Sequence, residues 1–233
     1  MNLTNIKAIR GLLHLFYPKL CVACEDEVPV EGEVFCLMCQ QALYYTDQSS
    51  KRNNEFEAHF LGRIPLERGA AMFYYRKDTP IQSIMHALKY AKKADVGSKL
   101  GAEFGKRLKR EGFMNGITAI VPVPLTWRKQ KARGYNQAEI LAKAISISTG
   151  VPCFGDFFIK THETESQTSK SRQERVENVA QAFEINQSYK LEEDHILLVD
   201  DVLTTGATLE ACAKKLNLDN VKVSMVTLAI GRI

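Results

Sequence analysis

The sequence predicts an α/β protein with a doubly wound parallel sheet, preceded by a small cysteine-rich module. Strand-like and helix-like patterns alternate from about residue 66 to the end of the chain, which is typical of a parallel sheet with helices on both faces. Four of the six cysteines lie within residues 1–45. Hydrophobic residues make up 45% and charged residues 25% of the chain, so a folded globular core is expected.

The expected elements follow from periodicity and from the residues that end them. The helical segments carry apolar residues at spacings of three and four, and two of them stop at glycines, Gly112 and Gly150. The strands are short apolar runs. In chain order we expect strand 70–75, helix 81–91, helix 97–111, strand 117–123, helix 138–148, strand 196–199, helix 208–216 and strand 221–229.

Three parts differ in character along the 233 residues. Residues 1–45 hold the cysteine module, which we expect to follow a short amphipathic helix. Residues 46–65 begin with a polar run that has no periodicity, so we interpret them as a linker. Residues 66–233 form the α/β domain, and a chain of this length suits one such domain with a small appendage.

The N-terminal segment is not expected to be a membrane span or a signal peptide. No stretch approaches the ~18 continuous apolar residues that a span needs. The apolar run that ends at Phe16 is short and contains His14, and Pro18 follows where a cleavage site would need small residues. We therefore expect a cytoplasmic protein in a reducing compartment, where cysteines bind metal more often than they form disulfides.

The strongest functional signal runs from Ile196 to Thr208. Its four leading apolar residues predict a central strand buried on both faces, and two acids follow at the carboxyl end, where open α/β sheets bind ligands. The next residues turn into a helix, so backbone N–H groups and the helix dipole favour an anion. Gly206 allows close approach of the backbone. The residues expected to contact the ligand are Asp200, Asp201, Thr204, Thr205, Gly206, Ala207 and Thr208.

A sugar phosphate reconciles two acids with a phosphate-binding turn. Asp200 and Asp201 can accept hydrogen bonds from ribose hydroxyls while residues 204–208 hold the 5-phosphate. A diphosphate on the anomeric carbon would need Mg²⁺ to offset its charge. The two acids are also the candidate catalytic residues, because they can stabilise a positively charged, oxocarbenium-like ribose. An ordinary strand–turn–helix with capping acids is the alternative interpretation.

This motif resembles the signature of type I phosphoribosyltransferases, and the chain is similar to the ComF family of competence proteins. The paired cysteines come first, as in that family, and the resemblance covers nearly the whole chain. Tyr135 stands where the family usually has phenylalanine. The other matching parts are 88–90, 122–125, 133–139 and the set Gln167, Arg172, Arg175, Asn178, Ala182 and Phe183.

The resemblance implies a domain that binds phosphoribosyl pyrophosphate or a related nucleotide. It also implies a role in DNA uptake during natural transformation. Basic residues near the motif are then candidates for the pyrophosphate, because guanidinium and ammonium groups bind phosphate; the alternative is solvated charge. Residues 160–178 are polar and long enough to predict a lid. The pyrophosphate candidates are Arg133, Arg128, Lys89, Arg172 and Arg175.

The cysteines of the N-terminal part form two CxxC pairs, which predict a structural zinc site. Two pairs complete a tetrahedral four-thiolate shell with no open position for catalysis, and the metal would fold a segment too small for its own core. Free buried thiols or two disulfides are the alternatives. The loop between the pairs is acidic, which disfavours contact with nucleic acid. The ligands are Cys21, Cys24, Cys36 and Cys39.

Three functions stay open from the sequence. The first is a ComF-like protein that binds phosphoribosyl pyrophosphate or a nucleotide with Mg²⁺ and acts in DNA uptake, with single-stranded DNA or the uptake machinery as partners. The second is an active phosphoribosyltransferase of nucleotide salvage, which would transfer a pentosyl group. The third is a zinc-finger nucleic-acid-binding protein, which the modest net charge of +4 does not favour.

Overall fold

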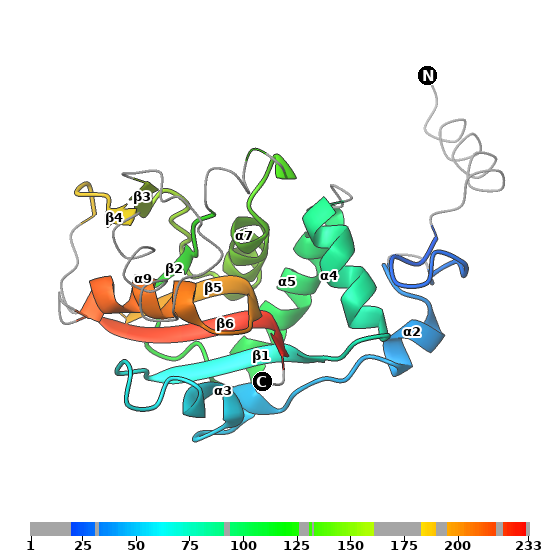
Figure 1. The fold of residues 1–233 in the computed structure, drawn as a ribbon, viewed down its shortest axis with the longest axis horizontal. Coiled ribbons are helices and arrows are strands. Elements are labelled where there is room, and N and C mark those ends of the chain that lie inside the picture. The colour runs from blue at the N-terminus through cyan, green and yellow to red at the C-terminus, as the bar shows by residue number, and fades with distance from the viewer. Residues whose placement is uncertain are drawn as a thin grey trace, which may run out of the picture.

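A computed structural model of the chain shows an α/β domain with the cysteine module packed against it (Figure 1). The structure describes residues 20–30, 33–90, 94–125, 131, 133–160, 183–189, 195–217 and 221–231. The helices are α2 (Leu37–Gln41), η1 (Gln48–Ser50), α3 (Glu55–Ala58), α4 (Pro80–Tyr90), α5 (Ala94–Arg110), α7 (Gln137–Thr149) and α9 (Ala207–Asn217). The strands are β1 (Arg68–Tyr75), β2 (Ala119–Pro122), β3 (Phe158–Lys160), β4 (Phe183–Ile185), β5 (His195–Leu203) and β6 (Lys222–Gly231).

The central sheet has four strands in the order β1-β6-β5-β2. All neighbouring strands are parallel, as the alternating pattern predicted. The functional motif occupies an inner strand, because β5 lies between β6 and β2. A second, two-stranded antiparallel sheet pairs β3 with β4 and was not expected from the sequence.

Apolar residues of β5 point alternately to the two faces of the sheet, because successive strand side chains do so. Leu197 and Val199 belong to the core that contains buried residues of α4, α5 and α7. Ile196 and Leu198 belong to the core that contains buried residues of α3 and α9. The doubly wound arrangement predicted from the sequence is therefore confirmed.

Residues 46–65, expected to be a linker, instead pack closely against β1. Gln48 accepts a hydrogen bond from the Ala71 backbone N–H at 2.9 Å, and Asn54 donates one to the Gly69 carbonyl at 2.9 Å. Phe56 and Phe60 are fully buried. The polar residues that suggested a linker serve here as hydrogen-bond partners for the edge of the sheet.

The functional strand is longer than the sequence predicted. Residues 196–199 were expected, but β5 continues to Leu203. Asp200 pairs with Thr227, and Val202 pairs with Ala229 on β6. Two acids in succession argued for a strand end, yet the backbone ladder with β6 continues through them because pairing is made by main-chain groups.

Across the described parts of the chain, no helix combines the length and apolar character that crossing a membrane requires.

Candidate functional site

The two acids of the motif lie on the carboxyl-terminal half of β5. The Asp200 carboxylate accepts a hydrogen bond of 2.7 Å from the backbone N–H of Asp201. The Asp201 side chain is 14% exposed, and its carboxylate lies 3.5 Å from the ammonium group of Lys89 at the end of α4. One of the predicted pyrophosphate candidates therefore lies beside one of the predicted acids.

The turn after β5 leads directly into α9. Gly206 has a φ of +71°, in the left-handed region that glycine adopts without a steric penalty. Its carbonyl accepts a hydrogen bond of 2.8 Å from the backbone N–H of Glu210, in the first turn of α9. The helix begins at Ala207, so its first backbone N–H groups and the positive end of the helix dipole lie next to residues 204–208. This arrangement suits a bound anion.

A hydrogen-bonded unit connects the end of α4 to the start of α7. The Leu88 carbonyl accepts hydrogen bonds from the Tyr135 hydroxyl and, at 3.2 Å, from the Gln137 amide. Gln137 is almost completely buried and accepts a hydrogen bond of 2.9 Å from Arg133. The Arg133 guanidinium also lies 5.8 Å from the ring centre of Tyr90.

The same unit brings together segments that are far apart in the sequence. Asn136 caps α7 by accepting a hydrogen bond of 3.0 Å from the Ala138 N–H, and it donates one of 3.0 Å to the Val123 carbonyl beyond β2. The carboxyl-terminal half of β5 therefore lies close to residues 88–90, which in turn contact residues 133–137.

Other sequence-predicted candidates lie outside the described residues. They are Arg128, Arg172 and Arg175, together with most of the expected lid. The strands β3 and β4, which flank residues 161–182, pair with each other in antiparallel register.

Sequence reasoning missed a contact made by residues of the supposed linker. His59 Nε2 lies 3.1 Å from the Thr205 carbonyl oxygen, in the turn before α9. Arg63 forms an ion pair of 3.2 Å with Glu210 on α9. The two segments are 146 or more residues apart in the chain, and no local pattern indicates that they meet.

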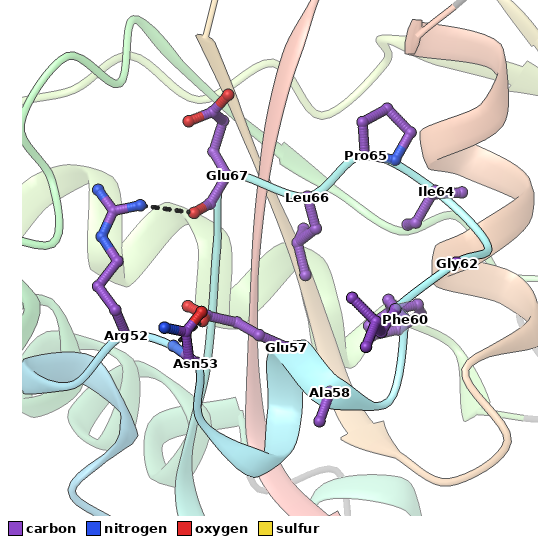
Figure 2. A pocket seen from close by; sticks show the side chains of 11 residues that line it. Arg52, Asn53, Glu57, Ala58, Phe60, Gly62, Ile64, Pro65, Leu66 and Glu67 are labelled. Carbon is purple, nitrogen blue, oxygen red and sulfur yellow. Dashed lines mark hydrogen bonds between the residues drawn. The ribbon is translucent and has the colours of Figure 1, made fainter.

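The pocket drawn in Figure 2 is a different feature from the predicted ligand site. It has a volume of about 550 Å³, and none of the predicted ligand residues lines it. Two of its charged side chains are bonded within the fold: Arg52 donates to the Glu67 carbonyl at 3.0 Å, and the Glu57 carboxylate accepts from the N–H groups of Asn53 and Gly69. We assign it no ligand.

The four cysteines of the N-terminal module form a cluster that fits a zinc ion. Their sulfur atoms all lie within 4.8 Å of one another, and the sulfurs of Cys24 and Cys36 are 4.0 Å apart. Tetrahedral zinc with Zn–S bonds of about 2.3 Å places sulfurs about 3.8 Å apart. The CxxC pairs predicted from the sequence therefore come together as a possible metal site should.

The protein around the cluster favours thiolate at one position. Burial alone would raise the pKa of Cys21, but backbone hydrogen bonds from Cys36, Cys24 and Ala23 lower it to about 7. Burial and the neighbouring thiols raise the pKa of Cys39, so metal binding there must displace a proton. The charge of a bound metal ion would supply the stabilisation that four adjacent sulfurs need.

Comparison with known proteins defines the class of this chain. The phosphoribosyl transferase domain family matches residues 131–231, which include the acids, the turn and α9. The chain therefore carries a phosphoribosyltransferase domain on a parallel sheet. Adenine phosphoribosyltransferase from Leishmania tarentolae, a solved structure, aligns with 79% of this chain and 80% of that chain, at 13% identity and a TM-score of 0.40.

Two curated proteins are similar to this chain in sequence. Competence protein F of Haemophilus influenzae is 27% identical over 238 residues, covering 96% of this chain and 97% of that protein. DNA utilization protein YhgH of Escherichia coli (strain K12) is 27% identical over 140 residues, covering 59% of this chain and 61% of that protein. The chain is thus a homologue of Competence protein F, and the resemblance to the ComF family seen in the sequence is confirmed.

Proposed function

We propose that this protein binds phosphoribosyl pyrophosphate or a related nucleotide with Mg²⁺ at Asp200–Thr208. The observation that carries the proposal is the continuous path from two acids on an inner strand, through Gly206, to the N-terminus of α9. The acids would accept hydrogen bonds from ribose hydroxyls, and residues 204–208 would donate to the 5-phosphate.

The basic residues near the acids suit the second phosphate group of such a ligand. Lys89 already lies 3.5 Å from Asp201, and Arg133 is fixed by its bond to Gln137. A bound Mg²⁺ would supply further positive charge against the diphosphate. These residues would support transfer of the ribose 5-phosphate group to an acceptor, because the acids can stabilise positive charge on the sugar ring.

We further propose that the ligand site serves DNA uptake and natural transformation. The names of the two relatives, a competence protein and a DNA utilization protein, support this role. Direct DNA binding by the metal module is less favoured, because Glu25, Asp26 and Glu27 are all exposed there. Deleting the gene from a naturally competent host should lower transformation frequency; an unchanged frequency would contradict this role.

Calorimetric titration tests the ligand proposal. The full chain with Mg²⁺ should bind phosphoribosyl pyrophosphate, and it should bind ribose 5-phosphate more weakly because the diphosphate contacts are lost. Glucose 6-phosphate is the control for nonspecific phosphate binding. No measurable affinity for phosphoribosyl pyrophosphate, or an equal affinity for glucose 6-phosphate, would refute the proposal.

Replacing Lys89 with methionine is expected to weaken binding of the diphosphate group and to leave binding of the 5-phosphate unchanged. Loss of one charged contact should weaken phosphoribosyl pyrophosphate about tenfold, while ribose 5-phosphate, which lacks the diphosphate, should bind as before. Titration of both ligands measures the difference. Lys106→Met, on the exposed surface of α5, is the matched control. Equal loss for both ligands would show that Lys89 does not act on the diphosphate.

A further inference from the structure

Three residues that follow or end α3 contact the turn between β5 and α9. We call His59, Phe60 and Arg63 the brace. They lie in the part of the chain that the sequence indicated as a linker, and Phe60 is 1% exposed. The contacts of the brace are with Thr205, Gly206 and Glu210, which belong to the proposed phosphate site or to the first turns of α9.

The contact of His59 fixes the direction of one peptide group. A carbonyl oxygen only accepts hydrogen bonds, so Nε2 of His59 donates to the Thr205 oxygen, 3.1 Å away. The C=O of Thr205 and the N–H of Gly206 belong to the same planar trans peptide and point in opposite directions. Holding the carbonyl against His59 therefore directs the Gly206 N–H away from the brace.

The position of Gly206 also depends on the brace. A Cβ at this residue would lie 3.0 Å from His59 Nε2 and 3.0 Å from two ring carbons of Phe60, closer than ordinary van der Waals contact. The glycine thus allows His59 and Phe60 to pack against the turn, in addition to allowing its φ of +71°.

Arg63 ties the brace to α9 itself. Its guanidinium forms the ion pair of 3.2 Å with Glu210, whose side chain is only 6% exposed, and it also donates to the His59 carbonyl. Lys214 lies 2.8 Å from the other oxygen of Glu210. The Arg63 side chain therefore connects the backbone of His59 to the first turn of α9.

We propose that His59 is a positioning residue of the phosphate site. By holding the Thr205 carbonyl, it keeps that oxygen dipole away from the bound 5-phosphate and presents the Gly206 N–H to it. The ligand class, a sugar 5-phosphate, rests on the proposed function; the orientation of the peptide follows from the bond between His59 and the Thr205 carbonyl. Free rotation of this peptide would turn an oxygen toward the anion and repel it.

Amide hydrogen exchange and ligand titration together test the role of His59. In His59→Ala, the amide of Ala207, which donates to the Thr205 hydroxyl at 3.5 Å, should exchange about fivefold faster in the ligand-free chain, because Thr205 is then held less firmly. Ribose 5-phosphate should bind about fivefold more weakly. His59→Gln, whose amide N–H can replace Nε2–H, should restore both values. Leu61→Ala is the control, because Leu61 is 84% exposed.

The outcomes distinguish this inference from the proposed function. Unchanged exchange at Ala207 in His59→Ala would overturn it, as would faster exchange with unchanged affinity for ribose 5-phosphate. Failure of His59→Gln to restore affinity would also overturn it, since a hydrogen bond would then not be the cause. If the wild-type chain binds no ribose 5-phosphate, the proposed function fails, and the exchange comparison still decides whether His59 holds the peptide.

Discussion

Changing both Asp200 and Asp201 to asparagine is expected to weaken phosphoribosyl pyrophosphate binding by at least about a hundredfold, because each charged hydrogen bond contributes about 1.5–3 kcal/mol. Asparagine keeps the size of each side chain and removes the charge that the ribose hydroxyls and Mg²⁺ need. Titration with the ligand in the presence of Mg²⁺ measures the change. A loss smaller than about threefold would show that the acids do not hold the ligand.

The stability of the same variant separates a binding role from a structural one. The Asp201 carboxylate forms an ion pair with Lys89. Asparagine at position 200 can still accept the Asp201 N–H, and one ion pair of this kind contributes about 1 kcal/mol or less, so the free energy of unfolding should fall by no more than about 1 kcal/mol. Asp78→Asn with Asp95→Asn, at exposed positions, is the matched control for charge. A marked fall in stability would favour a structural role for the acids.

Cys36→Ser is expected to abolish stoichiometric zinc binding. It should also destabilise the α/β domain, in addition to the metal module. Cys36 is 5% exposed, and Phe35 beside it belongs to the same core as Ile84 of α4. Without metal the module has too little core of its own, so these contacts should be lost. We expect a fall of about 3 kcal/mol or more in the free energy of unfolding, within the range for loss of a structural metal.

Metal analysis and denaturant unfolding of the purified chain check this prediction. Cys153→Ser is the matched control, because Cys153 lies outside the cluster and is only partly buried. It should retain one zinc ion per chain. If Cys36→Ser also retains one zinc ion and unfolds at the same denaturant concentration, the four cysteines do not form a structural metal site.

The fold could be predicted largely because burial leaves a periodic pattern. The apolar residues 196–199 indicated an inner strand, and Gly112 and Gly150 indicated where helices end; both glycines have positive φ values. The two CxxC pairs could be recognised because each pair is local in the sequence. These features depend on neighbours in the chain, so the sequence displays them directly.

The segment 46–65 could not be placed in this way. Gln48 and Asn54 are polar, yet they bond to backbone groups of β1, and hydrophobic periodicity does not detect such partners. The same is true of His59 and Thr205, which are 146 residues apart in the chain. Contacts of this kind depend on which segments the sheet brings together, and no short motif records them.

A crystal structure grown with phosphoribosyl pyrophosphate and Mg²⁺ would show directly whether the ligand binds at Asp200–Thr208. We expect a 5-phosphate at the N–H groups of residues 204–208, ribose hydroxyls on Asp200 and Asp201, and the Thr205 carbonyl still bonded to His59. A ligand bound elsewhere on the chain, or a turn left empty at saturating ligand concentration, would contradict it.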